Sequence, residues 1–492
     1  MYGPSLLDVV NALGGSGREI AKALTGSVNA GTDLSQLTGA GALRVENLDP
    51  VLFSVTVENK HFDLFNRLLP NKRESMSLLD QQIIKKGTGG FPGSAVSTET
   101  ATGRPERQGD YERLLTQLGV FADYRNVGVV TGIQGLLQQQ AGATNFSTVA
   151  EENVNAALTL LETVEWSCFY ADRGVNDLEI NGLLAQIKAA QATSTVQNLI
   201  DLRGGYFTDH EQIAKLAANI ARRPQFGQAD LLYTSTACKG DLDNCLISGY
   251  RVNLDSAVPN TVTGVPMKGI RYSAAGIGEG YMDLVPHAYI EEDKLPVCVQ
   301  APNSVGPQGP PAAVAASAAN LTSSMFVASQ SGNYYYAVEA CQPGQVSALT
   351  FIPAAVAVSA GEAVTLAITP SAANTETDYR IYRGRLNGTN QPDDVRLIAR
   401  VAKATNGTTT FVDYNQVIPG TSEAFMLTSA PQKRALTWIQ MLPLTQYPLA
   451  QTDLSIRWAV LLLGALRIPD ARKHGVITNI LPENAAWRPF NV

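Results

Sequence analysis

The chain has 492 residues, which is enough for about three domains at the usual domain size. Hydrophobic residues make up 45% of it, as in a folded protein with real cores, whereas charged residues make up only 16%, against about 25% in a typical protein. The net charge of −7 argues against a dedicated nucleic-acid binder, which normally carries a basic face.

The sequence gives no sign of export or of membrane insertion. Met1–Ser5 lacks the basic region and apolar core of a signal peptide. The longest apolar run, Trp458–Leu466, is too short to span a bilayer. We therefore expect a soluble protein made in a cytosol, and we expect its five cysteines, which show no CxxC spacing, to be reduced and structural.

The N-terminal part predicts an arm followed by a long hairpin. Residues 1–50 are rich in Gly, Ala, Ser and Thr, which indicates an extended arm. Two alternating stretches, Met76–Ile84 and Leu114–Tyr124, flank a Gly/Thr-rich tip and predict a protruding hairpin. Loops this long without their own core are usually functional or disordered, so a surface loop without a role is the alternative interpretation.

A long helix is predicted over residues 149–171. It begins at the capping box Thr148-Val149-Ala150-Glu151 and would be roughly 35 Å long. Its apolar positions recur at helical spacing on one face. A helix of this kind is core in any fold, so it says nothing about function. The positions are Val154, Ala157, Leu158, Leu161, Val164 and Cys168.

Residues 180–297 alternate between helical and strand patterns, which predicts a mixed α/β domain. The chain then returns to strand patterns after residue 431. The predicted helices are Asn181–Ala190 and His210–Ala221, and the predicted strands are Asp230–Thr234, Met267–Tyr272, Leu436–Leu444, Leu454–Leu466 and His474–Ile480.

A charge-poor segment of about residues 305–431 interrupts this pattern. It opens with the stiff, turn-rich stretch Gly306–Pro311 and continues with alternating runs such as Tyr334–Val338 and Ala363–Ile368. Asn-Gly turns at Asn387 and Asn406 are strong hairpin signals. Several short strands at this spacing predict a β-sandwich inserted into a larger host.

No motif predicts catalysis, a cofactor or a metal site. The four histidines are isolated, and neither an HExxH nor a GxSxG motif occurs. The glycine run Gly276–Gly280 lacks the ending of a phosphate loop, so we interpret it as a turn. The adjacent carboxylates Glu291-Glu292 and Asp393-Asp394 are expected in solvated turns rather than as acid/base pairs.

The order of arm, hairpin, long helix, α/β domain and strand-rich return resembles the Hong Kong 97-type major capsid protein of tailed bacteriophages. The resemblance covers most of the chain outside 298–431 and rests on the order of these stretches and on their residue patterns. The stretches that carry it are Asp110–Arg113 with Phe121–Val127, Glu151–Asp172, Asp201–Gly205 with Gln225–Tyr233, and Trp438–Ile480.

The resemblance implies an α+β fold with an inserted all-β domain. Tyr379–Gly384 and Thr410–Tyr414 give the insert its likeness to an immunoglobulin-like or fibronectin type III-like sandwich. The implied parts are an N-terminal arm (1–50), N-terminal strands and an extended loop (51–135, with the loop at about 72–124), a peripheral domain with the long helix (136–180), an axial domain (181–297), the inserted sandwich (298–431), and a return to the peripheral domain and the C-terminus (432–492).

The function implied by this resemblance is that of a non-enzymatic shell subunit. Copies would assemble in the host bacterial cytoplasm into an icosahedral virion shell of hexamers and pentamers, with double-stranded DNA held by non-specific proximity. Portal and decoration proteins are implied partners, and a separate scaffolding protein is implied because the chain starts at Met1 with a short arm. The alternatives are a soluble enzyme with a carbohydrate-binding sandwich and a surface adhesin, which the missing signal peptide counts against.

The expected inter-subunit residues lie on the extended loop. Some members of the family crosslink a loop lysine to an asparagine, but no partner can be matched here, and a solubilising tip is the simpler interpretation of the lysine pair. The residues are Lys85, Lys86, Phe91, Glu99, Arg104 and Arg107.

Overall fold

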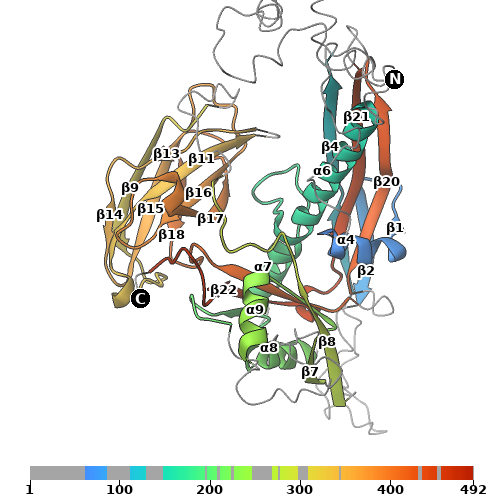
Figure 1. Ribbon diagram of the computed structural model, residues 1–492, viewed down its shortest axis with the longest axis horizontal. Helices are drawn as coiled ribbons and strands as arrows, with labels where there is room; N and C mark the ends of the chain where they lie inside the picture. Colours follow the sequence, from blue (N-terminus) through green and yellow to red (C-terminus); the bar gives the residue numbers. More distant parts are fainter. Residues whose placement is uncertain are drawn as a thin grey trace, which may run out of the picture. The chain divides into compact units, whose positions relative to one another are not determined.

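The computed structural model describes most of the chain, and the predicted arm (1–50) and the hairpin tip lie outside the described residues. Its helices, strands and connections form a mixed α+β protein (Figure 1). The described ranges are 61–85, 111–128, 148–193, 197–207, 211–222, 226–245, 269–274, 278–296, 309–342, 345–429, 435–450 and 456–490.

A four-stranded sheet of order β1-β20-β21-β4 contains the longest strands among the described residues (Figure 1). The predicted strands over Leu436–Leu444 and Leu454–Leu466 are confirmed as an antiparallel pair of 12 residues each. Trp438 is fully buried and covers Gly464, where a Cβ atom would clash with the indole Cζ2. The strands are β1 (Arg73–Glu74), β4 (Gly119–Val127), β20 (Thr437–Pro448) and β21 (Ile456–Arg467).

The predicted long helix is confirmed as α6 (Thr148–Tyr170), but its buried face differs from the predicted one. Val164 and Cys168 are fully buried as expected, whereas Val154 is 54% exposed. Leu160 and Ala156 are buried one turn and two turns before Val164, respectively. The core therefore follows an i, i+4 row of the helix, and the leucines at 158 and 161 are only half-buried.

A buried carboxylate of α6 caps a second helix. The short helix α4 (Asp63–Leu68) has no cap from its own preceding residue, Phe62. Glu165, which is 0% exposed, accepts hydrogen bonds from the backbone N–H groups of Leu64 and Phe65, both at 2.9 Å. These N–H groups have no partner inside the helix, and a negative charge is stabilising at a helix N-terminus. The carboxylate therefore joins two helices that are 100 residues apart in sequence.

His287 completes the surroundings of this carboxylate. Its Nε2 lies 2.8 Å from Glu165 Oε1, and both side chains are almost fully buried. Aromatic rings enclose the imidazole, with that of Phe169 at 4.7 Å and that of Tyr233 at 5.2 Å between centroids. The Tyr233 hydroxyl in turn donates to Asp63 at the start of α4, at 2.6 Å. The two helices and the segment that carries His287 thus share one polar cluster inside an aromatic shell.

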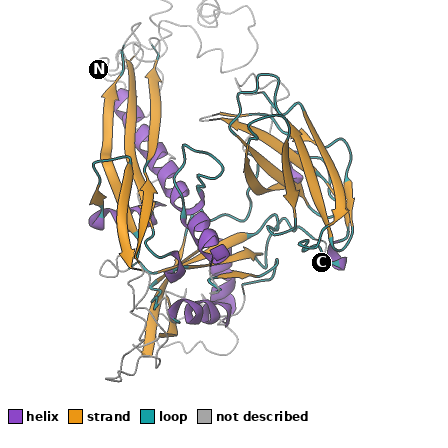
Figure 2. Cartoon of the chain, turned by 180° about the vertical axis from the view of Figure 1, so that it is seen from behind, coloured by secondary structure: helices purple, strands orange, loops and turns teal. Residues whose placement is uncertain are grey.

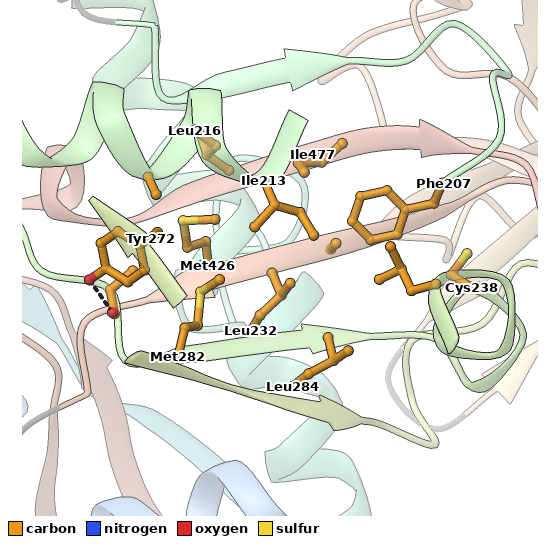
Figure 3. Packing of buried hydrophobic residues seen from close by; sticks show 14 of the residues in the cluster. Phe207, Ile213, Leu216, Leu232, Cys238, Tyr272, Met282, Leu284, Met426 and Ile477 are labelled. Carbon is orange, nitrogen blue, oxygen red and sulfur yellow. Dashed lines mark hydrogen bonds between the residues drawn. The ribbon is translucent and has the colours of Figure 1, made fainter. Parts of the chain in front are cut away.

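A six-stranded mixed sheet of order β5-β22-β19-β6-β8-β7 forms the second host layer. Side chains of α8, including Ile213 and Leu216, point onto Leu232, Met426 and Ile477 of the sheet (Figure 3). The helices predicted over 181–190 and 210–221 are confirmed. The elements are α7 (Leu183–Thr193), β5 (Leu199–Asp201), α8 (Glu211–Ala221), β6 (Leu231–Thr234), α9 (Thr236–Cys245), β7 (Gly269–Ala274), β8 (Gly278–Pro286), β19 (Ser422–Leu427) and β22 (Gly475–Ile480).

Two strands of this sheet come from segments that the sequence analysis assigns elsewhere. β19 falls within the predicted insert, and β22 within the predicted peripheral return. β19 pairs with both β22 and β6, so these strands occupy the middle of the sheet. All six residues of β19 are buried. A strand buried on both faces reads as a continuous apolar run, which cannot be assigned to one sheet from its pattern alone.

Between β8 and β19 the chain forms strands without an α-helix in the described residues 309–417 (Figure 2). One three-stranded sheet has the order β18-β15-β9, and a second has the order β12-β11-β16-β17 with β13 beside β11. The strands are β9 (Ala313–Asn320), β10 (Gly332–Tyr334), β11 (Tyr336–Gln342), β12 (Gln345–Val346), β13 (Thr350–Phe351), β14 (Val356–Val358), β15 (Glu362–Thr369), β16 (Asp378–Gly384), β17 (Val395–Ala402) and β18 (Thr409–Asp413).

An ion pair is buried in the middle of this β9–β18 segment. Arg383 is 0% exposed, and its guanidinium donates to Asp413 at 2.5 Å and to Asn415 at 2.7 Å. Tyr336 also donates to the Asp413 carboxylate, at 2.9 Å. Since breaking a buried pair leaves an uncompensated charge, this cluster favours a single packing of the strands around it.

Several polar contacts tie the β9–β18 segment to the rest of the chain. Arg400 forms an ion pair with Glu179 in the loop after α6. Leu397 N–H donates to the Lys294 carbonyl at 3.0 Å. Asp394, which the sequence analysis expects in a solvated turn, is 4% exposed and accepts from the indole N–H of Trp487 at 3.2 Å. That expectation is wrong because the C-terminal segment covers the turn.

We predict that Glu165→Ala destabilises the fold by about 3–5 kcal/mol, because it leaves two helix N–H groups and a buried imidazole without their acceptor. Urea unfolding followed by tryptophan fluorescence measures the change. Glu162→Ala on the same helix is the control, since Glu162 is partly exposed. Equal stability of the two variants would contradict this role of the carboxylate.

His474 is a buried neutral imidazole at the start of β22. Its Nδ1 accepts from the backbone N–H of Thr428 at 3.3 Å, and its Nε2 donates to the Ala435 carbonyl at 3.1 Å. Burial lowers the pKa of His474 from 6.5 to about 4. Between about pH 6.5 and pH 4 the His474 side chain is therefore protonated in the unfolded chain but neutral in the folded chain.

We predict that this histidine makes the protein less stable as the pH falls from about 6.5 to about 4. At 1.36 kcal/mol for each pH unit the full loss is roughly 3 kcal/mol. The measurement is the free energy of unfolding against pH for the parent and for His474→Gln, which cannot titrate. The difference between the two curves should change over this range, and parallel curves would show that His474 is not responsible.

Candidate inter-subunit surface

The predicted hairpin is present, and its two strands present different faces. β2 (Leu79–Lys85) pairs antiparallel with β3 (Tyr111–Gln117), from Leu79 opposite Gln117 to Lys85 opposite Tyr111. Side chains directly opposite each other lie on the same face of such a pair. The residues at odd positions from 79 to 83 therefore share a face with those at odd positions from 113 to 117.

This odd-numbered face is exposed along its whole described length. Ile83 is 70% exposed, Leu115 is 56% exposed and Leu79 is 43% exposed. The remaining members of the face, Gln81, Arg113 and Gln117, are exposed as well. On the opposite face most side chains are half-buried. We call the exposed set, residues 79, 81, 83, 113, 115 and 117, the hairpin face.

A two-stranded ribbon with an uncovered apolar face is marginally stable in water. Burying a side chain such as Ile83 or Leu115 contributes about 1.5–3 kcal/mol. A partner that covers the hairpin face therefore gains affinity from these side chains and stabilises the ribbon at the same time. The geometry is suited to docking on another protein surface rather than to chemistry.

The foot of the hairpin is anchored to the long sheet. Asp80 of β2 forms an ion pair with Arg467 at the end of β21, and both side chains are largely buried. Where β3 meets β4, the backbone N–H of Leu118 donates to the Leu78 carbonyl at 2.8 Å. The ribbon therefore leaves the four-stranded sheet from a fixed base.

Further apolar side chains are exposed on the four-stranded sheet. β20 carries Met441, Leu444 and Tyr447, each more than 40% exposed. β4 carries Val120 at 57% and Tyr124 at 70%. Exposed apolar side chains are suited to protein–protein contacts, so β20 and β4 are further candidates for such contacts.

The structure places only one of the sequence-predicted inter-subunit residues. Lys85 is the last residue of β2. Lys86, Phe91, Glu99, Arg104 and Arg107 lie outside the described residues. Sequence reasoning chose the polar tip and missed Leu79, Ile83 and Leu115. Their signal was the two-residue alternation of the arms, which predicts one apolar face without telling whether that face is covered.

The described residues also bear on metal binding and on membrane insertion. Within the described ranges, no group of three or more His, Cys, Asp or Glu side chains could hold a metal ion. His287 and His474 are both engaged in buried hydrogen bonds. Of the helices that the structure describes, none is long and apolar enough to cross a membrane.

The sequence is similar to phage capsid proteins along almost its whole length. It is 23% identical over 448 residues to the major capsid protein of Staphylococcus phage S25-3, and the alignment covers 90% of each chain. The major capsid protein of Staphylococcus phage K is also 23% identical, over 449 residues and 90% of each chain. No family model matches the sequence.

Solved structures give weaker matches. The capsid of an empty GTA particle has a TM-score of 0.43 and 8% identity, covering 92% of this chain and all of that one. The capsid of Myoviridae phage XM1 has a TM-score of 0.38 and 9% identity, covering 88% and 97%. The SrpI encapsulin of Synechococcus elongatus has a TM-score of 0.37 and 10% identity, covering 94% and 100%.

We predict that Ile83→Thr combined with Leu115→Thr weakens self-association at least about tenfold while the fold stays intact. Threonine suits a strand, and these side chains contribute little to the core of one copy. Sedimentation at several concentrations measures association, and circular dichroism measures folding. Leu178→Thr, at a position 65% exposed elsewhere, is the control. Association of the double variant at the parental strength would refute a role of the hairpin face.

Proposed function

We propose that this chain is the major capsid protein of a tailed bacteriophage. Copies of it self-assemble into an icosahedral shell of hexamers and pentamers that encloses double-stranded DNA. The protein acts as a structural subunit rather than as an enzyme, and its place is the capsid of the virion.

The observation that carries this proposal is the end-to-end similarity to phage major capsid proteins. The alignments span 90% of this chain and 90% of each relative, so the similarity is not confined to one shared domain. The exposed hairpin face supports the proposal independently, because a subunit that functions alone has no use for an uncovered apolar ribbon.

The described elements can be assigned to the parts of a Hong Kong 97-type subunit. The hairpin of β2 and β3 is the extended loop, which reaches a neighbouring copy. The four-stranded sheet with α6 is the peripheral domain. The six-stranded sheet with α7, α8 and α9 is the axial domain around the centres of hexamers and pentamers. The β9–β18 segment is an inserted immunoglobulin-like domain, with β19 returning to the axial sheet.

The partners follow from this function. Copies of the chain are the main partner, and a scaffolding protein, a portal and decoration proteins are expected beside them. The packaged DNA is held by enclosure, in keeping with the net charge of −7, rather than by a dedicated basic face. Assembly takes place in the cytoplasm of the host bacterium. As a further part of this proposal, Lys85 or Lys86 forms a covalent crosslink to a second copy of the chain.

The test is particle formation in cells that express the chain with its neighbouring scaffold gene. We predict closed particles in negative stain for the parent. Replacing Gly87–Gly103 by a short turn should leave the subunit folded but stop shell closure, since a loop tip contributes little to its own core. A parent that stays monomeric at every concentration would remove the proposed function, and normal shells from the shortened variant would show that the tip is dispensable.

A further inference from the structure

Three asparagines of the chain are followed directly by glycine, at Asn181, Asn387 and Asn406. An Asn-Gly step is chemically labile, because glycine has no Cβ atom to hinder its backbone nitrogen. That nitrogen can attack the side-chain carbonyl carbon of the asparagine and close a five-membered succinimide ring. Whether a folded chain allows the attack depends on how the side-chain amide and the glycine nitrogen are held.

The fold restrains the step at Asn181. Its Oδ1 accepts from the backbone N–H of Arg173 at 3.2 Å. The N–H of Gly182 donates to the Ala171 carbonyl at 2.8 Å, and Gly182 is buried. A nitrogen that is bonded and buried in this way reaches the side-chain carbon only after local unfolding.

Asn387 is exposed, yet its step is restrained as well. Its Oδ1 accepts from the backbone N–H of Asn333 at 3.1 Å. The N–H of Gly388 donates to the Arg385 carbonyl at 3.0 Å, and the Asp394 carboxylate lies close to this glycine. Exposure alone therefore does not release an Asn-Gly step, because hydrogen bonds can hold both of its reacting groups.

The step at Asn406 lacks both restraints. It lies in the loop between β17 and β18, where residues 405–408 are all exposed. Among the described residues, neither Asn406 nor Gly407 has a hydrogen-bond partner. Gly407 has a φ of +75°, which favours glycine over residues with a side chain. The conformation of the loop thus selects the residue that makes the preceding asparagine reactive.

We propose that Asn406 is a site of spontaneous deamidation in the folded protein. The Gly407 nitrogen loses its proton and forms a bond to Cγ of Asn406, and the Cγ–Nδ2 bond breaks with release of ammonia. Water, the only co-reactant, then opens the succinimide at either carbonyl carbon and leaves aspartate or isoaspartate. Because an aspartate side chain has a pKa of about 3.9, each event adds a negative charge at neutral pH.

The added charge falls on the β9–β18 segment without reaching its core. Residues 405–408 contribute nothing to the buried hydrophobic cluster of this segment. We therefore expect the modified chain to keep its fold, since changes at exposed positions away from the core usually have small effects on stability. A molecule that persists would carry a more acidic loop as it ages.

The first experiment compares the three steps within one molecule. The folded full-length chain is incubated at mildly alkaline pH, and peptide mass spectrometry follows the exchange of NH2 for OH at each asparagine. We expect Asn406 to convert at least about tenfold faster than Asn387 (about 1.4 kcal/mol). The comparison is matched, because both steps have the sequence Asn-Gly-Thr. Asn181 should be slow as well.

The same incubation in denaturant shows whether the fold sets these rates. There the steps at Asn387 and Asn406 should convert at similar rates, since their restraints are gone. Equal rates in the folded chain would overturn the proposal. A lead of Asn406 that persists unchanged in denaturant would also overturn it, because local sequence rather than the fold would then set the rate.

The second experiment removes the reactive amide. Asn406→Gln should lose the main acidic form that the parent develops on isoelectric focusing, because glutamine would have to close a less favourable six-membered ring. Asn390→Gln, at another exposed asparagine of the segment, is the control and should acidify as the parent does. Circular dichroism checks that each variant is folded. Acidification of Asn406→Gln at the parental rate would overturn the site, and since free chains are used, the result is independent of the proposed function.

Discussion

The buried carboxylate of Glu165 is the interaction on which the arrangement of the host layers depends. It takes two N–H groups from the start of α4 and one from His287, so three distant segments meet at a single charge. A buried charge is costly unless all of its partners are in place. The position of α4 relative to α6 is therefore specified, and with it the point from which the chain enters β1 and the hairpin.

A fixed base makes the hairpin a suitable element for joining copies. The ion pair of Asp80 with Arg467 holds its foot, while the face of Leu79, Ile83 and Leu115 stays uncovered. The base thus supplies the stability that an isolated ribbon lacks. The small share of charged residues in the chain fits a surface that is largely covered by neighbours.

Much of the fold could be predicted from local patterns. The helical pattern that follows Thr148 predicts α6, and the alternating arms predict the hairpin, because both signals are carried by residues close in sequence. The membership of β19 and β22 in one sheet could not be predicted in this way. Each is a short buried run whose neighbours lie far away in sequence, and only the pairing of the whole sheet decides where it belongs.

The sequence predicts where the candidate surface lies, but it does not predict which of its side chains are exposed. Alternation in the arms indicates an apolar face, yet whether Ile83 is covered depends on how the rest of the chain packs. Glu165 and Asp394 show the same limit for charged residues, because neither has a sequence neighbour that reveals its burial. A pattern that points to solvent, as for Asp394, is overridden when a distant segment such as Trp487 packs over it.

The most direct test of the central claim, that the hairpin is completed by another copy, is amide hydrogen exchange in free subunits and in assembled particles. The account predicts that the amides of residues 79–85 and 111–117 exchange quickly in the free subunit and become at least about tenfold slower in the particle, whereas the core strand β19 is protected in both. Equal exchange of the hairpin in the two states would contradict the claim that a second copy covers it.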